Sequence, residues 1–399
     1  MIALAIASPA GAQVQLRSTV ELVESVPVET SLDNPDLRNT HEVWLEMIRR
    51  AARTLDLEQF YISNKNGEPL EDIIRAIEQA AGRGVFVRII ADMRFSKTYP
   101  ETLERLSQQK GIAVRIVDYG KLASGVQHAK YFIVDQQEVF LGSQNFDWRA
   151  LKHIHELGMC IRHRELARFY QDIFELDWQL AQHNDRTRLQ SYLVPQRYPV
   201  PYTIVEHSDT VRLIPTASPI GFIPDSSLWD EPQIVRLIDA AEREVSLQFL
   251  GYDTRARDGS EYRVLDDALR RAAARGVKVR LLVSDWEKGT PAEKALKELT
   301  RVQNIEVRFM VIPEWSGGYI SFARVQHCKF IVADGREFWL GTSNAEKSYF
   351  YNSRNVGVIV HSSRLARIVD DIFKKSWNSA YAERVDPNVT YERRKREGE

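Results

Sequence analysis

The sequence predicts an α/β protein composed of two similar halves, each with helices on both faces of a sheet. Segments with a helical spacing of apolar residues alternate with short runs rich in Val and Ile, which is typical of strands buried between helices. The chain has 399 residues, well above the roughly 100–200 residues of one domain. Blocks of the first part also recur in the second part, so we expect two halves of one architecture.

An internal repeat relates the two halves residue by residue. The sequence VQHAK at residues 126–130 returns as VQHCK at residues 325–329. Residues 126–178 then align with residues 325–377 without a gap. Two chance matches would not keep one register over so long a stretch, so we interpret the chain as a duplication.

Each half is expected to contain the same elements in the same order. A helix leads into a strand, a second helix ends at an Arg-Gly turn, and further strands follow. Gly84 and Gly276 suit these turns because glycine readily takes the left-handed conformation after a helix end. In the first half we expect the helix 41–54 and the strands 55–62, 85–90 and 113–117. In the second half we expect the helix 233–243 and the strands 245–252, 277–283 and 306–311.

Composition marks the boundaries of the halves. We expect the first half over residues 22–182 and the second half over residues 219–385. Residues 183–218 hold four prolines and have no clean period, so we interpret them as the connector. The tail at residues 386–399 is charged and is expected to fray.

The N-terminus has two features of a secretory signal. Residues 1–12 read MIALAIASPAGA, an apolar run that ends in small residues, although the basic start of a signal is missing. If this segment is a signal peptide, the protein is exported to the periplasm or the extracellular space. If it is only an apolar N-terminus, the protein is cytoplasmic. No apolar run approaches the about 20 residues needed to cross a bilayer.

Charge and cysteine content exclude several classes of protein. Lys and Arg number 54, Asp and Glu number 55, and the formal net charge is −1. A nucleic-acid scaffold with a basic surface over the whole molecule is therefore disfavoured, whereas a local basic pocket is not. Two cysteines cannot form a disulfide framework, and no Cys/His cluster has the spacing of a zinc site. We expect neither a metal nor a cofactor.

The chemistry is expected in two copies of one motif. His128, Lys130 and Asp135 form H-x-K-x4-D, and a Gly-Ser-x-Asn segment ending at Asn145 follows them. The second copy consists of His327, Lys329, Asp334 and a Gly-Thr-x-Asn segment ending at Asn344. On a strand, residues i and i+2 point to one face, so each His projects with its Lys. Together with the hydroxyls of Ser143 and Thr342, these side chains predict a cationic, donor-rich pocket suited to a phosphodiester.

These motifs resemble the duplicated motif of the phospholipase D superfamily. The flanking residues narrow the resemblance to the animal lysosomal phospholipase-D-like 5′ exonucleases and their poxvirus relatives; they are Asn145-Phe146-Asp147-Trp148-Arg149, Glu156-Leu157-Gly158, Phe322-Ala323-Arg324-Val325 and Ser348-Tyr349-Phe350. The similarity runs from about residue 22 to residue 377. One departure stands out, because those relatives read Asn-Trp where this chain has Asn344-Ala345-Glu346. Substrate contacts of the second half are therefore expected to differ.

The resemblance implies a phospholipase D fold of two α-β-α halves that share one active site. It also implies displacement at phosphorus in two steps without a metal. His128 would attack to give a phosphohistidine, and His327 would protonate the leaving oxygen and then activate water. Lys130, Lys329, Asn145 and Asn344 would hold the phosphate oxygens. Asp135 and Asp334 belong to the catalytic motif but would support the strand ends, because a carboxylate facing the phosphate would repel it.

Three further residues are candidates with two interpretations each. Glu156, which aligns with Asn355 of the second half, either orients an active-site histidine or forms a surface ion pair. Tyr349 and Phe350 follow the second motif, and they either stack on a nucleobase or pack in the core.

Three functions follow from these observations. The first is a 5′ exonuclease acting on single-stranded DNA or RNA. The second is a phospholipase D that hydrolyses or transfers phospholipid headgroups, for which residues 220–224 (Ile-Gly-Phe-Ile-Pro) are the candidate lipid-facing rim. The third, a binding module without catalysis, is disfavoured because every His, Lys and Asn of both motifs is present. A homodimer is a further expectation about assembly.

Overall fold

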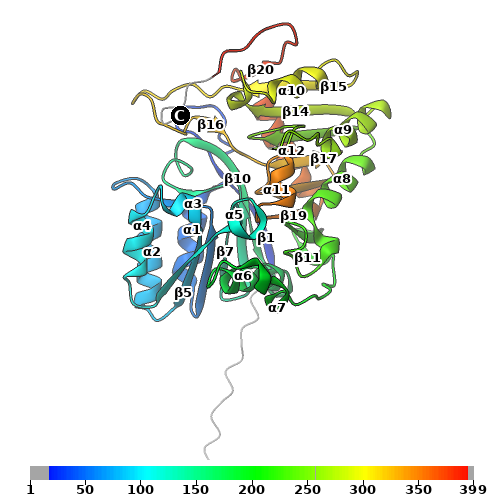
Figure 1. Cartoon of the computed structure of the whole chain (residues 1–399). Coiled ribbons are helices and arrows are strands. Elements are labelled where there is room, and N and C mark those ends of the chain that lie inside the picture. Colours follow the sequence, from blue (N-terminus) through cyan, green and yellow to red (C-terminus); the bar gives the residue numbers. More distant parts are fainter. Residues whose placement is uncertain (1–17, 257, 394–399) are drawn as a thin grey trace, which may run out of the picture.

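The computed structural model describes residues 18–256 and 258–393, which form two α/β halves (Figure 1). The proposed signal at residues 1–12 and the last residues of the charged tail lie outside the described residues. Each half is built on a mixed sheet of nine strands, and the ninth strand of the first sheet comes from the second half. The α/β fold with two similar halves is thereby confirmed.

The first sheet has the strand order β2-β1-β10-β8-β7-β3-β5-β6, and β16 of the other half pairs with β10. Strands β3, β5 and β6 are parallel, whereas β7 is antiparallel to β3. The elements of the first half are β1 (Thr19–Ser25), β2 (Arg38–Asn39), α1 (Thr40–Arg50), β3 (Thr54–Gln59), β4 (Ile62–Ser63), α2 (Leu70–Gly82), β5 (Phe86–Asp92), α3 (Met93–Ser96), α4 (Glu101–Ser107), β6 (Ile112–Val117), α5 (Tyr119–Ala123), β7 (Lys130–Val134), β8 (Glu138–Gly142), β9 (Phe146–Asp147), β10 (Ile154–Arg162), α6 (Arg164–Leu180) and α7 (Leu189–Tyr192).

The second sheet has the strand order β11-β12-β19-β18-β17-β13-β14-β15-β20 and repeats the pattern of the first. The elements of the second half are β11 (Tyr202–Glu206), β12 (Asp209–Ser218), α8 (Asp230–Ala240), β13 (Glu244–Phe249), α9 (Val264–Ala274), β14 (Lys278–Ser284), α10 (Glu293–Leu299), β15 (Ile305–Met310), β16 (Val325–Gln326), β17 (Phe330–Ala333), β18 (Glu337–Gly341), α11 (Lys347–Tyr351), β19 (Asn355–His361), α12 (Ser363–Trp377) and β20 (Ala382–Arg384).

The expected helices and strands are present, with shifted ends. The predicted helix 41–54 ends at Arg50, because the turn that follows is held by hydrogen bonds to Asp135. Gly84 and Gly276 follow α2 and α9 with φ of 94° and 89°, as the Arg-Gly turns predict. His128 and His327 were expected on strands, but each lies in the extended segment just before β7 or β17.

The segment 183–218 is not the irregular connector that its prolines predict. It contains α7, β11 and β12, and β12 pairs with β19 over residues 212–218. The second sheet therefore begins at Tyr202, before the expected boundary at residue 219. Strand β12 corresponds to β1 of the first half, which pairs with β10 in the same way. Pairing across the sheet outweighs the local turn signal of Pro215, which lies opposite Val358.

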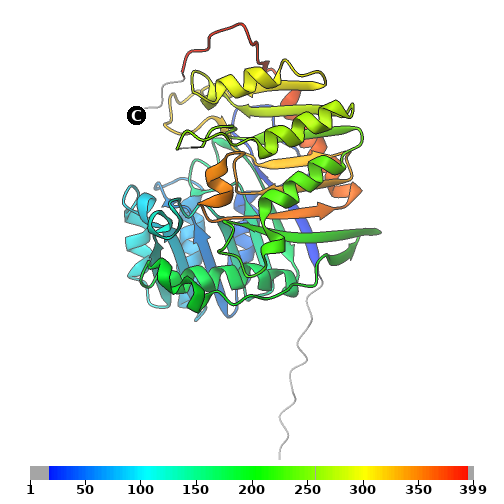
Figure 2. The same cartoon turned by 45° about the vertical axis from the view of Figure 1, so that its right-hand side comes forward.

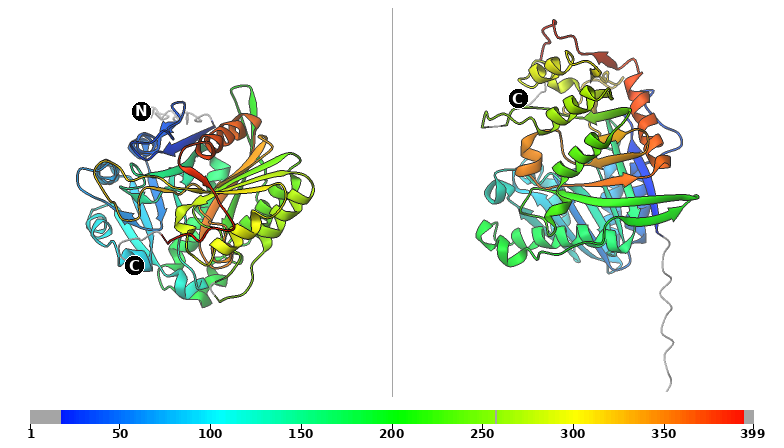
Figure 3. Two further views of the ribbon diagram at one scale, coloured as in Figure 1. Left: turned by 90° about the horizontal axis from the view of Figure 1, so that it is seen from above. Right: turned by 90° about the vertical axis from the view of Figure 1, so that its right-hand side faces the viewer.

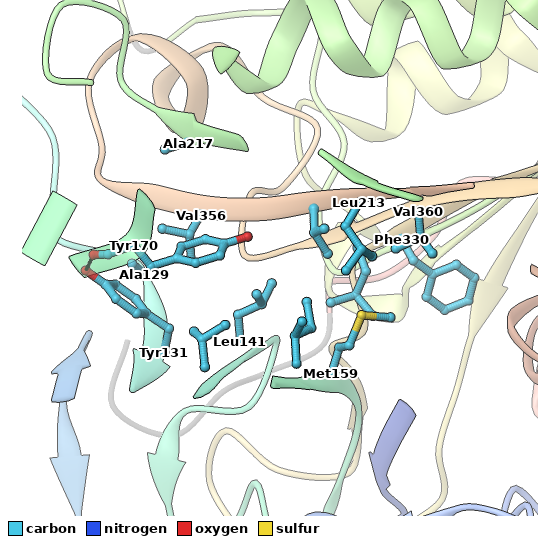
Figure 4. Packing of buried hydrophobic residues seen from close by; sticks show 14 of the residues in the cluster. Ala129, Tyr131, Leu141, Met159, Tyr170, Leu213, Ala217, Phe330, Val356 and Val360 are labelled. Carbon is cyan, nitrogen blue, oxygen red and sulfur yellow. Dashed lines mark hydrogen bonds between the residues drawn. The ribbon is translucent and has the colours of Figure 1, made fainter. Parts of the chain in front are cut away.

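Helices cover both faces of each sheet, and the halves meet through one shared core (Figures 2 and 3). Helices α1 and α2 pack with their sheet in one apolar cluster, and α8, α9 and α10 do the same in the second half. A larger cluster joins α6, α12 and the inner faces of both sheets. Figure 4 shows Tyr131, Leu141 and Met159 of the first sheet facing Leu213 and Phe330 of the second.

None of the helices in the described part of the chain is both long and apolar enough to cross a membrane.

Candidate active site

Each motif histidine is held by the backbone of the other half. The N–H of His128 donates to the carbonyl oxygen of Arg354 at 2.9 Å. The N–H of His327 donates to the carbonyl oxygen of His155, also at 2.9 Å. Both histidines are buried, with exposed fractions of 5% and 7%. The site therefore forms only where the two sheets meet.

The ring of His128 is oriented by an amide from the second half. Its Nδ1 lies 3.0 Å from Oδ1 of Asn355, the first residue of β19. The Asn355 Nδ2 group donates to the carbonyl oxygens of Tyr349 and Ser353, so its oxygen faces the imidazole. Because an amide oxygen only accepts, Nδ1 carries the proton and Nε2 is left with a free lone pair in the neutral ring.

The ring of His327 is oriented by a carboxylate from the first half. Its Nδ1 lies 2.8 and 2.9 Å from the two oxygens of Glu156, which is completely buried in β10. Of the two interpretations of Glu156, contact with an active-site histidine is the one observed. The site is therefore nearly symmetric in shape but has a carboxylate on one side and an amide on the other.

The hydroxyls of Ser143 and Thr342 lie behind these partners and do not line the pocket, contrary to their assignment as substrate-binding residues. Thr342 Oγ1 donates to Asn355 Oδ1 at 2.9 Å and accepts the N–H of Val356 at 3.1 Å. Ser143 Oγ accepts the N–H of Leu157 at 3.0 Å and also bonds to Glu156. Both residues are fully buried, so each supports the group that orients a histidine.

The two motif lysines are buried beside the histidines. Each ammonium group donates to the carbonyl oxygen of its own histidine at 2.6 Å. Burial and the charge of Lys329 hold the pKa of Lys130 well below its usual range. Burial lowers the pKa of Lys329 to about 8, although Glu156 acts in the opposite direction. Two buried cations that repel each other provide a binding site for an anion.

The acid–base groups respond to burial and to these lysines. Burial, followed by the charges of Lys130 and Lys329, lowers the pKa of both histidines well below the usual value. Burial raises the pKa of Glu156 to about 8, against the effect of Lys329. The Glu156–His327 pair therefore retains an additional proton at neutral pH. The His128–Asn355 pair has no such proton, because the amide of Asn355 does not titrate.

Asn145 and Asn344 are buried, with exposed fractions of 7% and 2%. Among the described residues, neither side-chain oxygen has a hydrogen-bond partner. Buried polar atoms without partners are uncommon and often mark the place of a ligand or an ordered water.

Asp135 and Asp334 stand apart from the site, although they complete the motif in the sequence. Asp135 accepts the N–H groups of residues 52–54, and Asp334 accepts those of residues 242–244. Each lies at the far end of the strand that follows its lysine. They anchor the turns before β3 and β13, as expected of supports for the strand ends, and they are not catalytic residues.

The two aromatic candidates, Tyr349 and Phe350, have different surroundings. Tyr349 is half-buried and its ring lies edge-on to His128 at 4.8 Å between centroids. Phe350 is completely buried in the apolar cluster of the second half, so it cannot stack on a substrate. Sequence reasoning missed Phe60, whose ring centroid lies 4.8 Å from that of His128. Its position directly after a buried strand was the signal available.

Among the described residues there is no group of three or more His, Cys, Asp or Glu side chains arranged to hold a metal ion.

Comparisons with known proteins show the family of the chain. The chain matches the family described as cardiolipin synthase, PLD-like domain, over residues 44–178 and again over residues 233–377. It is 27% identical to phospholipase D Z of Dictyostelium discoideum, over 92% of this chain and 91% of that protein. It is 30% identical to the human 5′-3′ exonuclease PLD3, over 92% of this chain and 81% of that protein.

Solved structures with the same fold include proteins of other activities. Phosphatidylserine synthase from Haemophilus influenzae superposes with a TM-score of 0.62 at 15% identity, covering 88% of this chain and 85% of that one. Polyphosphate kinase from Porphyromonas gingivalis superposes with a TM-score of 0.56 at 16% identity, covering 93% of this chain and 49% of that one. With the motif and the domain both present twice, the chain belongs to the phospholipase D superfamily of phosphodiesterases.

Proposed function

We propose that the enzyme cleaves phosphodiesters through a phosphohistidine without a metal, and that it removes nucleotides from the 5′ end of single-stranded DNA or RNA. One observation carries the proposal. Two histidines have their Nδ1 atoms held by opposite halves, and two buried lysines lie beside them.

In the first step, Nε2 of neutral His128 forms a bond to phosphorus as the bond to the leaving oxygen breaks. His327 donates the proton that this oxygen needs. In the second step, His327 takes a proton from water, the oxygen of that water attacks phosphorus, and the bond from phosphorus to nitrogen breaks. Lys130, Lys329 and the two asparagines stabilise the charge of each transition state.

The different partners of the histidines support this division of roles. The Glu156 carboxylate stabilises a protonated imidazole, which is the form required of a general acid. The Asn355 amide accepts the Nδ1 proton without adding negative charge, which favours the neutral imidazole required of a nucleophile.

Similarity to the 5′-3′ exonuclease PLD3 supports nucleic acid as the substrate class. Similarity to phospholipase D Z supports the alternative, a phospholipase acting on headgroups. Burial of the candidate lipid-facing rim at residues 220–224 weakens that alternative. Phe222 and Ile223 lie in the core with exposed fractions of 3% and 4%. We also propose that the protein is exported after cleavage near Gln13, which mass spectrometry of the secreted chain would test.

The test is a time course on single-stranded oligonucleotides in EDTA, with 5′-hydroxyl and 5′-phosphate versions side by side. We expect stepwise shortening from the 5′ end that is absent in His128→Ala and His327→Ala. Loss of activity on chelation would contradict the mechanism. Near-normal activity of either variant would contradict the paired histidines. If the protein cleaved no oligonucleotide but released headgroups from phosphatidylcholine vesicles, the phospholipase would be the correct function and the exonuclease would not.

A further inference from the structure

The two flanks of the active site differ chemically, although the halves share one fold. Four rings lie in the segments that follow β3 and β5, and the first of them contacts His128; they are Phe60, Tyr61, Phe95 and Tyr99. The positions at the same distance after β13 and β14 in the second half are Leu250, Gly251, Glu287 and Pro291. Since the second half folds without aromatic residues there, the fold does not require these rings.

The four rings form a continuous stack that leads to the nucleophile. Ring centroids lie 4.0 Å apart for Phe60 and Phe95, 5.8 Å for Tyr61 and Phe95, and 5.0 Å for Tyr61 and Tyr99. The rings of the last two pairs are near parallel. All four residues are only partly buried. The hydroxyl of Tyr61 donates to Asp147 at 2.8 Å, which holds the stack in place.

Cations lie among these rings. Lys130 Nζ is 4.9 Å from the centroid of Phe60, and the Arg149 guanidinium is 5.6 Å from that of Tyr99. Arg94 and Lys97 are exposed on either side of Phe95. Rings interleaved with cations are the combination that binds single-stranded nucleic acid, because bases stack on the rings and phosphates pair with the charges.

The four equivalent positions of the second half hold neither a ring nor a cation. A Cβ at Gly251 would lie 2.7 Å from Oε1 of Glu346 and 2.9 Å from Oε1 of Glu287, so both carboxylates converge there. Asn344 Nδ2 lies 3.9 Å from the same point. Burial and the charge of Glu346 raise the pKa of Glu287 to about 8. Glu287 therefore keeps its proton at neutral pH, and the ring cluster of the first half has no counterpart at these positions of the second half.

We propose that Phe60, Tyr61, Phe95 and Tyr99 form a nucleobase-stacking subsite that binds the base next to the phosphodiester held at His128. This inference rests on the proposed action on nucleic acid. Stacking tolerates any base, so the subsite favours nucleotides over abasic or lipid phosphodiesters and not one sequence over another.

The test measures how much the loss of a base weakens oligonucleotide binding, first in protein that has all four rings and then in protein that lacks one of them. His327→Ala, which binds but does not turn over substrate, is titrated with a 3′-fluorescein oligonucleotide that carries either normal nucleotides or tetrahydrofuran residues at its first two positions. We expect the missing bases to weaken binding about tenfold. Adding Phe95→Leu or Tyr99→Leu should reduce that difference to less than about twofold. Phe86→Leu is the matched control, because Phe86 is 51% exposed at the opposite end of β5.

Thermal melting of each variant verifies that it is folded. Equal binding of the normal and abasic oligonucleotides, in protein that still shortens single strands, would overturn the subsite and leave the exonuclease in place. An equal loss of discrimination in Phe86→Leu would also overturn it. If wild-type protein cleaved no oligonucleotide but released headgroups from phosphatidylcholine vesicles, the proposed function would fail and the subsite with it.

Discussion

At the scale of single residues, the difference between Glu156 and Asn355 distinguishes two otherwise equivalent histidines. Both orient an imidazole through Nδ1, but only Glu156 can stabilise a positive charge on its partner. The sequence reveals both histidines and both lysines, since they recur in identical spacing. It does not reveal which acidic or amide side chain approaches which ring, because those contacts join residues that are far apart in the chain.

Replacing Glu156 should change the pH dependence of catalysis as well as its rate. The pKa of Glu156 is raised to about 8, so the Glu156–His327 pair loses its additional proton as the pH rises through about 8. We expect the basic limb of the kcat profile near that pH in the wild type. Glu156→Gln should lower kcat by about 10²–10⁴-fold and displace this limb. Glu165→Gln, on the exposed first turn of α6, is the control. An unchanged profile in Glu156→Gln would contradict the acid role of the pair.

The buried lysines predict stabilisation by anions. Inorganic phosphate bound beside Lys130 and Lys329 should offset their mutual repulsion. At about 100 times its Kd, such a ligand stabilises the folded state by about 2.7 kcal/mol. We expect a concentration-dependent rise in Tm for the wild type and little rise for Lys130→Met. A similar rise in both proteins would place phosphate elsewhere.

At the scale of elements, the aspartates of the motif are anchors of secondary structure. Asp135 receives the backbone of the turn between α1 and β3, and Asp334 receives the equivalent turn before β13. Both copies of the motif have an aspartate at this spacing, and in both it fixes the start of a strand beside its neighbour. The helices and most strands follow from local periodicity, whereas β11 and β12 were missed because prolines obscured strands that form through pairing with β19.

Asp135→Ala should therefore lower the free energy of unfolding and leave kcat nearly unchanged. Loss of a carboxylate that caps several backbone N–H groups costs about 0.5–2 kcal/mol. We expect a lower denaturant midpoint with kcat within about threefold of the wild type, measured on folded protein at low temperature. A loss of kcat as large as that of His128→Ala, without a change in stability, would return Asp135 to the reaction.

At the scale of the whole molecule, the two halves are joined by a buried ion pair next to the active site. Arg354 of the second half lies 2.5 and 2.9 Å from the carboxylate of Asp177 in the first, and both side chains are completely buried. The carbonyl oxygen of Arg354 also accepts the N–H of His128. Stability and the position of the nucleophile thus depend on the same residue.

Arg354→Leu should lower both the free energy of unfolding and the rate of catalysis. It leaves Asp177 buried without its cation, which costs about 3–5 kcal/mol. Catalysis should fall as well, because the segment that holds His128 loses its support. Arg197→Leu removes an ion pair to Asp225 in which the arginine is 78% exposed, and such a pair contributes about 0–1 kcal/mol. Equal losses of stability in the two variants, measured by denaturant unfolding, would contradict this account.

The sequence by itself determined the α/β class, the duplication and the paired His and Lys residues, because helical period, strand runs and repeated motifs are local properties of the chain. Only the tertiary structure decided that Glu156 and Asn355 cross to the opposite half, that Ser143 and Thr342 lie behind them and that Phe350 belongs to the core. Those positions depend on how the two sheets pack face to face. That packing minimises the exposed apolar area of the whole molecule, and no short segment encodes it.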